Sequence, residues 1–404
     1  MPLLRSLPAL TAALLLAACR AESAPAAPET ALPSLVRAEV GNAAPVRQIA
    51  AAEDGLYLVD EAGKLFRLGS NGQTEALAEG FAPDVLLGAE EGLAVGGWRD
   101  NGGLLRLNAW RAEGHQAYGY FPAAAHAASV WHSGCLIAAA EAGGAAYPVR
   151  ACPQKETLNI RAERRDITLL PDSRPVLWQG RAAVLGSPDA HSYRHGVLGD
   201  GIEAKTLYLL DTQTLRDAAE PFTLPAGLVF ENNTVAAYGG KIAAVVSGSG
   251  AGARTVVLAL QNGRWQIESQ STPLPENRWQ SPFVFDGALY AVQMPHLAGR
   301  LVRYTAAAGG RLSERELGGG LSNHAMGSRD TNIGAVLPAY ALIPQAGYRR
   351  LYALDKTGRL HRLEPELPAR IVRSAVQGSR SYWLLADSSV WVWRQPETER
   401  ISGG

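Results

Sequence analysis

The sequence predicts an all-β fold. Helical periodicity is scarce, and short apolar or alternating runs recur in its place, as is typical of strands. Gly, Asn, Asp and Pro bound these runs, and the chain holds 43 Gly and 24 Pro, so it turns often. Hydrophobic residues make up 47% of the sequence, enough for a large core.

Units of strand, turn and strand repeat along the chain. Equivalent apolar positions lie 37 to 59 residues apart, and they are Leu56, Leu93, Leu136, Ala183, Ile242, Leu289, Val336 and Leu384. A period of about 40 to 50 residues is typical of propeller repeats, in which radially stacked sheets bury their faces and leave only short edges. We therefore expect a β-propeller of eight blades over residues 46–404, with seven blades as the alternative. Either the last repeat or the segment 46–52 is expected to close the ring.

The N-terminus has the layout of a secretory signal. Arg5 supplies a positive charge, the run Leu10–Ala18 is almost wholly apolar, and small residues follow. This run is well short of the roughly 20 residues that span a bilayer as a helix, and no later run reaches that length. Residues 1–18 are therefore predicted to be a signal peptide, and no transmembrane helix is expected.

The residues at the cleavage point, Leu16-Ala17-Ala18-Cys19, resemble the lipobox of bacterial lipoproteins. The resemblance implies that Cys19 is fatty-acylated and becomes the mature N-terminus. Arg20 follows it where lipoproteins retained at the inner membrane often carry Asp, which favours the outer membrane. The alternative is an ordinary signal peptide with a chance cysteine. Residues 19–45 are rich in Ala and Pro and are predicted to be a flexible tether.

Cys135 and Cys152 are predicted to form a structural disulfide in this oxidising compartment. If Gly143-Gly144 forms a two-residue hairpin turn, a favoured pair for that position, the two cysteines are equidistant from it and face each other. They then occupy a non-hydrogen-bonded pair, with Cα atoms about 4.5 Å apart. A redox role is the weaker alternative, because the sequence has no C-x-x-C motif.

Four loops rich in polar and aromatic residues are predicted to share one rim of the propeller. Residues 98–103 and 187–201 would connect second and third strands, and residues 276–281 and 318–332 would connect successive blades. Binding residues favour loops on a rigid scaffold, although long solvated loops are the plainer interpretation. The expected partner-binding residues are Trp98, Arg99, Asp100, Arg278, Trp279, His324, Arg329 and Asp330.

The loop 187–201 is a second candidate site, for a small ligand. Its candidate residues are Asp189, His191, Tyr193, His195 and Asp200. The histidines lack a helix that would set metal geometry, and Asp200-Gly201 lacks the alternating acids of a calcium loop. We therefore expect no metal and no cofactor, and the plainer interpretation is that these are surface histidines.

One stretch resembles a known propeller motif. LYALDKTGRL, residues 351–360, is similar to the strand motif of quinoprotein-type propellers, although His361 and Arg362 stand where a Trp normally follows. The plan of lipobox, tether and propeller is similar to that of the propeller lipoproteins of the bacterial outer-membrane β-barrel assembly machinery. The resemblance implies a lipid-anchored envelope protein, on the periplasmic side of the outer membrane in preference to the cell surface.

Two functions remain. The first is a non-catalytic, monomeric scaffold that binds an envelope protein. The second is an enzyme, or a carbohydrate- or small-ligand-binding lipoprotein, with its site at the mouth of the central channel. The first is preferred because the sequence offers no convergent catalytic set. The formal net charge of +0 argues against nucleic acid as a partner.

Overall fold

The computed structural model describes residues 32–41, 44–112, 115–124, 128–170, 172–193, 195–198 and 201–397. The predicted signal peptide and Cys19 lie outside these ranges, as does Asp200. Within the unit Pro33–Gly404, the described strands form successive antiparallel groups of four, which are called blades and numbered along the chain. The first four blades are β2–β5 (Val46–Ala52, Gly55–Asp60, Leu65–Leu68, Thr74–Ala78), β6–β9 (Gly88–Glu90, Leu93–Arg99, Leu105–Arg111, His115–Pro122), β10–β13 (Val130–His132, Cys135–Ala142, Ala145–Gln154, Thr157–Glu163) and β14–β17 (Val176–Trp178, Arg181–Asp189, Glu203–Asp211, Phe222–Thr223).

Four further groups complete this unit. Blades 5 to 7 are β19–β22 (Ala236–Tyr238, Lys241–Gly248, Ala251–Gln261, Arg264–Gln270), β23–β26 (Gln280–Phe285, Ala288–Gln293, Arg300–Ala307, Arg311–Gly318) and β27–β30 (Ala335–Val336, Tyr340–Pro344, Leu351–Asp355, Leu360–Arg362). Blade 8 combines β31–β33 (Ile371–Gln377, Arg380–Leu385, Val390–Arg394) with β1 (Val36–Arg37). A short strand, β18 (Leu228–Phe230), bridges blades 4 and 5, and η1 (Gly196–Leu198) is a single helical turn.

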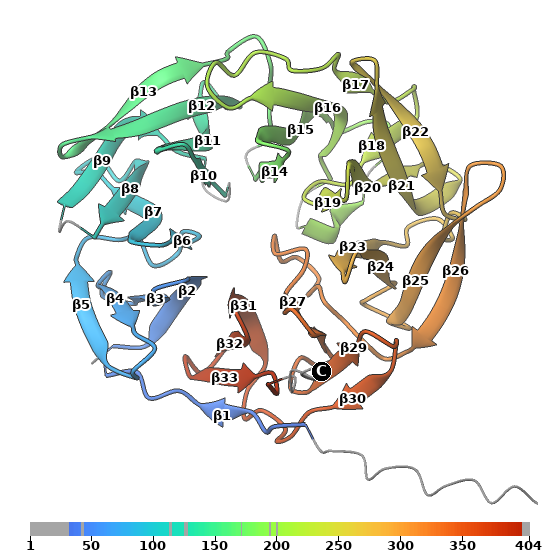
Figure 1. The fold of residues 1–404 in the computed structure, drawn as a ribbon. Helices are drawn as coiled ribbons and strands as arrows, with labels where there is room; N and C mark the ends of the chain where they lie inside the picture. The colour runs from blue at the N-terminus through green and yellow to red at the C-terminus, as the bar shows by residue number, and fades with distance from the viewer. Residues whose placement is uncertain are drawn as a thin grey trace, which may run out of the picture. The chain divides into compact units, whose positions relative to one another are not determined.

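The blades follow one another around a ring, with the first strand of each innermost (Figure 1). The predicted β-propeller is therefore confirmed as the fold class. Seven of the eight equivalent apolar positions used to find the repeat lie on the second strand of their blade. The eighth, Val336, lies on the first strand of its blade, β27. No helix in the described part of the chain is long and apolar enough to cross a membrane.

Apolar clusters lie between neighbouring blades. One joins blades 8 and 1 through Leu58 and Tyr382, and another joins blades 2 and 3 through Leu107 and Leu136. Between blades 4 and 5 the rings of Trp178 and Trp265 lie 5.4 Å apart. The faces of each sheet are thus covered by its neighbours, which is why the strands read as apolar runs.

Of the two predicted closing segments, the last repeat takes part in the closure and the segment 46–52 does not. The segment 46–52 is β2, the innermost strand of blade 1, whereas β1 pairs with β33 and so joins the two ends of the propeller (Figure 1). Leu35 is 2% exposed, and the Trp393 indole donates a hydrogen bond to the Pro33 carbonyl at 2.8 Å. The propeller therefore begins near residue 33, within the range predicted to be tether.

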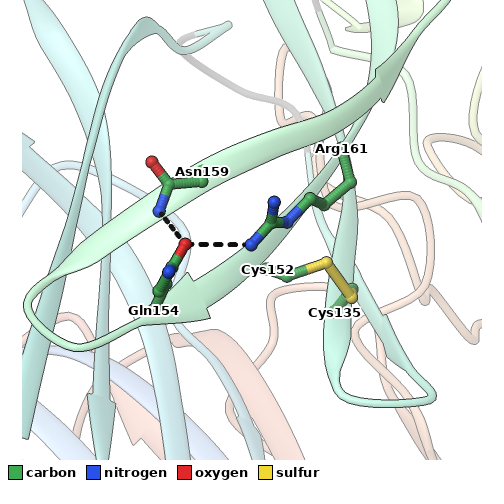
Figure 2. The surroundings of a disulfide bond; sticks show 5 residues. All are labelled: Cys135, Cys152, Gln154, Asn159 and Arg161. Carbon is green, nitrogen blue, oxygen red and sulfur yellow. Dashed lines mark hydrogen bonds between the residues drawn. A yellow bond between two sulfur atoms is a disulfide. The ribbon is translucent and has the colours of Figure 1, made fainter.

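The predicted hairpin and its disulfide are confirmed. Ala142 pairs with Ala145 and Leu136 with Ala151, so Cys135 and Cys152 face each other and are bonded. Gly143 and Gly144 both adopt positive φ, as the tight turn requires. Figure 2 shows the bond beside the edge of blade 3, where the Gln154 side-chain oxygen accepts hydrogen bonds from Asn159 and Arg161.

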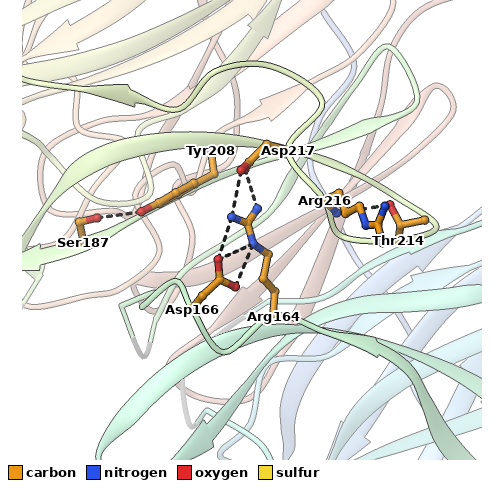
Figure 3. A network of polar contacts seen from close by, with 7 residues as sticks. All are labelled: Arg164, Asp166, Ser187, Tyr208, Thr214, Arg216 and Asp217. Atoms are coloured by element: carbon orange, nitrogen blue, oxygen red, sulfur yellow. Dashed lines mark hydrogen bonds and ion pairs between the residues drawn. The ribbon is translucent and has the colours of Figure 1, made fainter.

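Blades 3 and 4 are also joined by an arginine. Arg164, just after β13, donates two hydrogen bonds to Asp217 in the connection between β16 and β17, at 2.6 and 2.9 Å (Figure 3). Its guanidinium also contacts Asp166, and these carboxylates raise the pKa of Arg164. Nearby, Ser187 and the Tyr208 hydroxyl lie 2.9 Å apart. The bidentate pairing of Arg164 with Asp217 therefore adds a polar contact to the apolar contacts between blades 3 and 4.

Candidate functional site

The four loops predicted to share one rim occupy the kinds of connection that the sequence predicted. Residues 100–104 connect β7 to β8 and residues 190–202 connect β15 to β16, which are second-to-third connections. Residues 271–279 and 319–334 connect β22 to β23 and β26 to β27, which are connections between blades. In antiparallel blades both kinds of connection leave the sheet at the same end, which is called the loop rim.

The connection 319–334 crosses the loop rim, and it is called the plug loop. It starts and ends at blades 6 and 7, yet the Gly327 amide donates to the Val197 carbonyl at 2.9 Å. The Thr331 hydroxyl donates to the Asn233 carbonyl at 2.6 Å, and the Ser281 hydroxyl donates to the Thr331 carbonyl. The plug loop is therefore held by the connections of blades 4 and 5 and by β23 of blade 6.

Ion pairs fix the end of the plug loop at the mouth of the channel. The Asp330 carboxylate lies between Arg174 and Arg373, at 2.9 and 3.1 Å. Burial acts to raise the pKa of Asp330, but the two guanidinium groups outweigh it and the pKa lies below its ordinary value. Arg329 pairs with buried Asp172 at 2.6 Å. Two polar cavities of about 320 Å³ each lie beside Arg174, Asp330 and Arg373.

A network of buried polar side chains lies behind this mouth. Glu203 and Glu231 are each 1% exposed, and their carboxyl groups interact electrostatically. The Asn232 amide donates to Glu203 at 2.7 Å, and its side-chain amide donates to Asp172 at 2.6 Å. Burial, with the Glu231 charge second, raises the pKa of Glu203 well above its ordinary value. A protonated Glu203 can then donate to Glu231.

His195 links this network to an apolar pocket. Its Nδ1 lies 3.0 Å from the Glu231 carboxylate, which fixes Nδ1 as the protonated nitrogen and leaves Nε2 as an acceptor in the neutral ring. His195 lines a cavity of about 360 Å³ on the loop rim, called the rim pocket, whose walls are His195, Gly196, Val197, Asn277, Arg278, Trp279, Met294, Pro295, His296, Leu297 and Met326.

Stacked rings form one wall of the rim pocket. The Trp279 ring lies parallel to His296, with 6.2 Å between centroids, and 4.5 Å from His324. His324 Nε2 donates to the Ser328 carbonyl at 2.7 Å, so its neutral Nδ1 accepts from His296 Nε2 at 2.9 Å. Burial lowers the pKa of His324 to about 4. Burial likewise lowers the pKa of His296, the histidine of this stack that lines the pocket.

Two of the predicted partner-binding residues are buried. Trp279 is 2% exposed and His324 is 0% exposed, so they cannot be open-surface contacts. Trp279 packs on Val197 and Leu198 because a large apolar ring is stabilised by burial. Arg278 is half-buried at the pocket lip, and its Nη1 donates to the Asn277 carbonyl at 3.0 Å.

The predicted residues of the 98–103 loop have local roles. Asp100 accepts backbone hydrogen bonds from Gly102 and Leu104 and pairs with Arg106 at 2.6 Å, which closes the turn. Trp98 packs edge-on against Tyr118. Arg99 pairs with Asp84, which lines the channel-mouth cavity together with Arg329. The loop 98–103 is therefore connected to the channel-mouth cavity through the contact of Arg99 with Asp84.

The predicted ligand loop is divided. Asp189 accepts from the His191 and Ser192 amides, and these and the Ser192 hydroxyl lower its pKa to about 2. Exposed His191 lies in the turn, whereas Tyr193 is buried and its hydroxyl accepts from the Asn277 amide at 3.0 Å. His195 alone of these lines the rim pocket. Within the described ranges no group of three or more His, Cys, Asp or Glu could hold a metal ion.

The comparison with known proteins supports the fold. No family model matches the sequence, and no curated protein sequence matches it. BamB from Moraxella catarrhalis has a similar structure, with a TM-score of 0.54 at 15% identity, over 91% of this chain and 98% of that one. The computationally designed protein Ika8 gives a TM-score of 0.59 at 12% identity, over 89% and 99%. At these identities the likeness shows a propeller fold, so the function has to be argued from the site.

Several residues of the site escaped the sequence analysis. Met294 and Leu297 lie in the second-to-third connection of blade 6, which reads MPHLAG and is the same kind of connection as the loop 98–103. Arg174 lies in a connection between blades, whereas Arg373 lies on an innermost strand. A polar residue on an innermost strand faces the channel or its neighbours, and that rule could have signalled Arg373. Nothing local could have signalled that Glu203 and Glu231 meet.

Proposed function

We propose that this protein is a lipid-anchored, non-catalytic propeller scaffold that binds a protein partner in the bacterial envelope through its loop rim. The anchor would be acylated Cys19 in the outer membrane, with the propeller on the periplasmic side. The rim residues, and not the outer strands, would contact the partner. The propeller is proposed to act as a monomer without cofactor or nucleic acid.

The observation that carries this proposal is an apolar pocket with two exposed apolar side chains in its wall. Leu297 and Met326, at its edge, are 62% and 73% exposed. Leu104 and Ile202, in two other loops of the same rim, are 55% and 40% exposed. Water solvates such groups poorly, and exposed apolar side chains next to an apolar pocket are typical of a protein interaction site.

The charged groups of the rim fit a protein interface. Arg329 is paired with Asp172, and Asp330 is shared by Arg174 and Arg373. Such paired charges around an apolar centre match the polar rim of protein interfaces. Methionines at the centre can repack around a bound side chain.

Site-specific photo-cross-linking tests this proposal. A photoreactive phenylalanine analogue at position 326 or 297 should cross-link to an envelope protein in living cells. The same analogue at Ile267 is a matched control, because this residue is 41% exposed on the outer strand β22. Equal cross-linking at 267 and 326, or none at 326 and 297, would contradict the proposal.

The proposed acylation of Cys19 is tested by a separate measurement. Labelled fatty acid should enter the full chain and be absent from Cys19→Ser, which should leave the membrane fraction. A wild-type protein that fractionates as freely soluble would refute the anchor and leave the rim proposal standing.

The alternative is an enzyme or ligand-binding site reached from the channel mouth. It is favoured by the buried Glu203–Glu231 pair and its contact with His195, since raised carboxyl pKa values gather at functional sites. Turnover of an ester or a sugar that is lost in His195→Ala would replace the scaffold proposal with this one.

A further inference from the structure

We infer that the rim pocket binds an apolar side chain of the partner that has an acidic residue next to it in sequence. This inference rests on the proposed function and names the chemistry that the rim recognises. It joins two observations, the apolar walls of the pocket and one arginine at its lip.

The residues that line the pocket indicate that the side chain it binds is apolar. Met294 and Leu297 supply apolar surface, the buried Trp279 ring backs the wall, and the volume of about 360 Å³ is near the lower end of ligand pockets. Burial lowers the pKa of His296, which lines the pocket, and of His324 behind it. An apolar side chain that packs against Trp279 and His296 would therefore displace water from this wall, while Arg278 and His195 supply the polar groups of the pocket.

The acidic half follows from Arg278. Other arginines of the loop rim have carboxylate partners: Arg99 pairs with Asp84, Arg174 and Arg373 with Asp330, and Arg329 with Asp172. Arg278 donates one hydrogen bond to a backbone carbonyl and forms no ion pair with any residue of the described ranges. A guanidinium has five N–H donors in a fork that matches a carboxylate, so Arg278 retains donors for an incoming acid.

The charged groups around Arg278 do not neutralise it. Glu276, two residues away, is exposed and accepts from the Gly250 amide at 3.1 Å. The Glu231 carboxylate is buried and engaged by His195 and Glu203. Charge complementarity therefore favours a partner carboxylate over a cation at the lip.

The occupant is an internal segment of a partner protein. Leu297 and Met326 are on the pocket wall, yet they remain 62% and 73% exposed. A chain that continues on both sides of the inserted residue would cover these surfaces, whereas a chain that ended in the pocket would leave one of them in water. The recognised motif is thus an apolar residue followed or preceded by Asp or Glu within a longer segment.

The chain offers a direct probe of binding. It has three methionines, and Met294 and Met326 both line the pocket, while Met1 lies in the predicted signal peptide. In protein carrying ¹³C-methyl methionine, a ligand in the pocket should shift both methyl resonances. Variants with Leu at each position in turn would assign them.

Three capped hexapeptides test the inference. Acetyl-Ser-Gly-Leu-Asp-Gly-Ser-amide should shift both resonances, with a Kd roughly tenfold lower than the peptide with Asn in place of Asp. The peptide with Ser in place of Leu should bind more weakly than either. Arg278→Gln should remove the preference for Asp over Asn, whereas Arg264→Gln, a matched change at an exposed arginine on β22, should preserve it.

The contrary outcomes are distinct. Equal binding of the Asp and Asn peptides, or a preference for Asp that survives Arg278→Gln, overturns the acidic half. Tighter binding of acetyl-Ser-Gly-Leu with a free carboxylate overturns the internal segment. If no peptide shifts either methyl at tens of millimolar while photo-cross-linking at position 326 still captures a partner, this inference fails and the scaffold proposal survives.

Discussion

Glu203 and Glu231 lie side by side behind His195, and water has almost no access to either. A buried carboxylate beside a second one is costly, because the low dielectric disfavours charge and the two charges repel. The raised pKa of Glu203 follows from both causes, with burial the larger. A proton on Glu203 would relieve this repulsion and could be donated to the Glu231 carboxylate.

This pair makes stability depend on pH. In the unfolded chain Glu203 loses its proton near the ordinary value of about 4.3, whereas the folded protein keeps it to higher pH. The unfolded state therefore binds fewer protons in that window, and stability falls as pH rises through it. Each unit of raised pKa corresponds to about 1.4 kcal/mol.

Replacement of Glu203 by Gln should remove this dependence. The amide can donate to Glu231 and accept from the Asn232 backbone, as the protonated carboxyl does. Thermal melts from pH 5 to 8 should show a gap in Tm in favour of Glu203→Gln that widens with pH. The exposed Glu276→Gln should show no widening gap, and a Glu203→Gln protein equally destabilised at every pH would mean that the folded state holds Glu203 charged.

At the scale of the element, the hairpin of blade 3 was predictable residue by residue. Gly143-Gly144 sets a turn, the turn sets the register, and the register places the two cysteines opposite each other. All three steps are local in sequence. Pro148 is tolerated because it pairs with Ala139 at a position where the ladder needs no N–H from it.

Loss of the disulfide should lower stability without changing function. Closing a loop of this length stabilises a protein by about 3 kcal/mol, mainly by restricting the unfolded chain. The double variant Cys135→Ser, Cys152→Ser should therefore unfold at lower urea concentration, and it should keep the partner cross-link at Met326. Reductant should lower the unfolding midpoint of the wild type and not that of the variant. Two alkylatable thiols in native protein from the envelope would refute the bond.

The plug loop could not be predicted in the same way. Its residues were noticed as a polar loop, but its contacts join Arg329 to Asp172 and Gly327 to Val197, which are far apart in sequence. The periodicity of apolar residues indicates which face of a helix or strand is buried. It does not indicate which loops are in contact across a ring. The burial of Trp279 was missed for the same reason, since His296 and His324 reach it from other connections.

At the scale of the whole molecule, the join between the two ends decides whether the propeller is a closed ring. Blade 8 takes three strands from the C-terminal part and one, β1, from the N-terminal part. A strand of two residues has no period to detect, and it lies among Ala, Pro and Glu, so composition alone assigns it to the tether. Its order comes from tertiary contact: Leu35 is buried, and its amide donates to the Glu364 carbonyl at 2.7 Å.

Substitutions at two adjacent residues of this join, one buried and one exposed, test its contribution to stability. Leu35 is 2% exposed and Val36 is 56% exposed, so the same truncation should have unequal effects at neighbouring positions. Leu35→Ala should cost about 2 to 3 kcal/mol, because it removes buried methyl groups and leaves a cavity at the seam. Val36→Ala should change stability by less than about 0.5 kcal/mol. Urea unfolding would give both values, and limited proteolysis should cut Leu35→Ala faster because β1 leaves β33 more often. If the two variants unfold at the same midpoint, the join does not hold the ring, and the propeller is stabilised by its blade contacts alone.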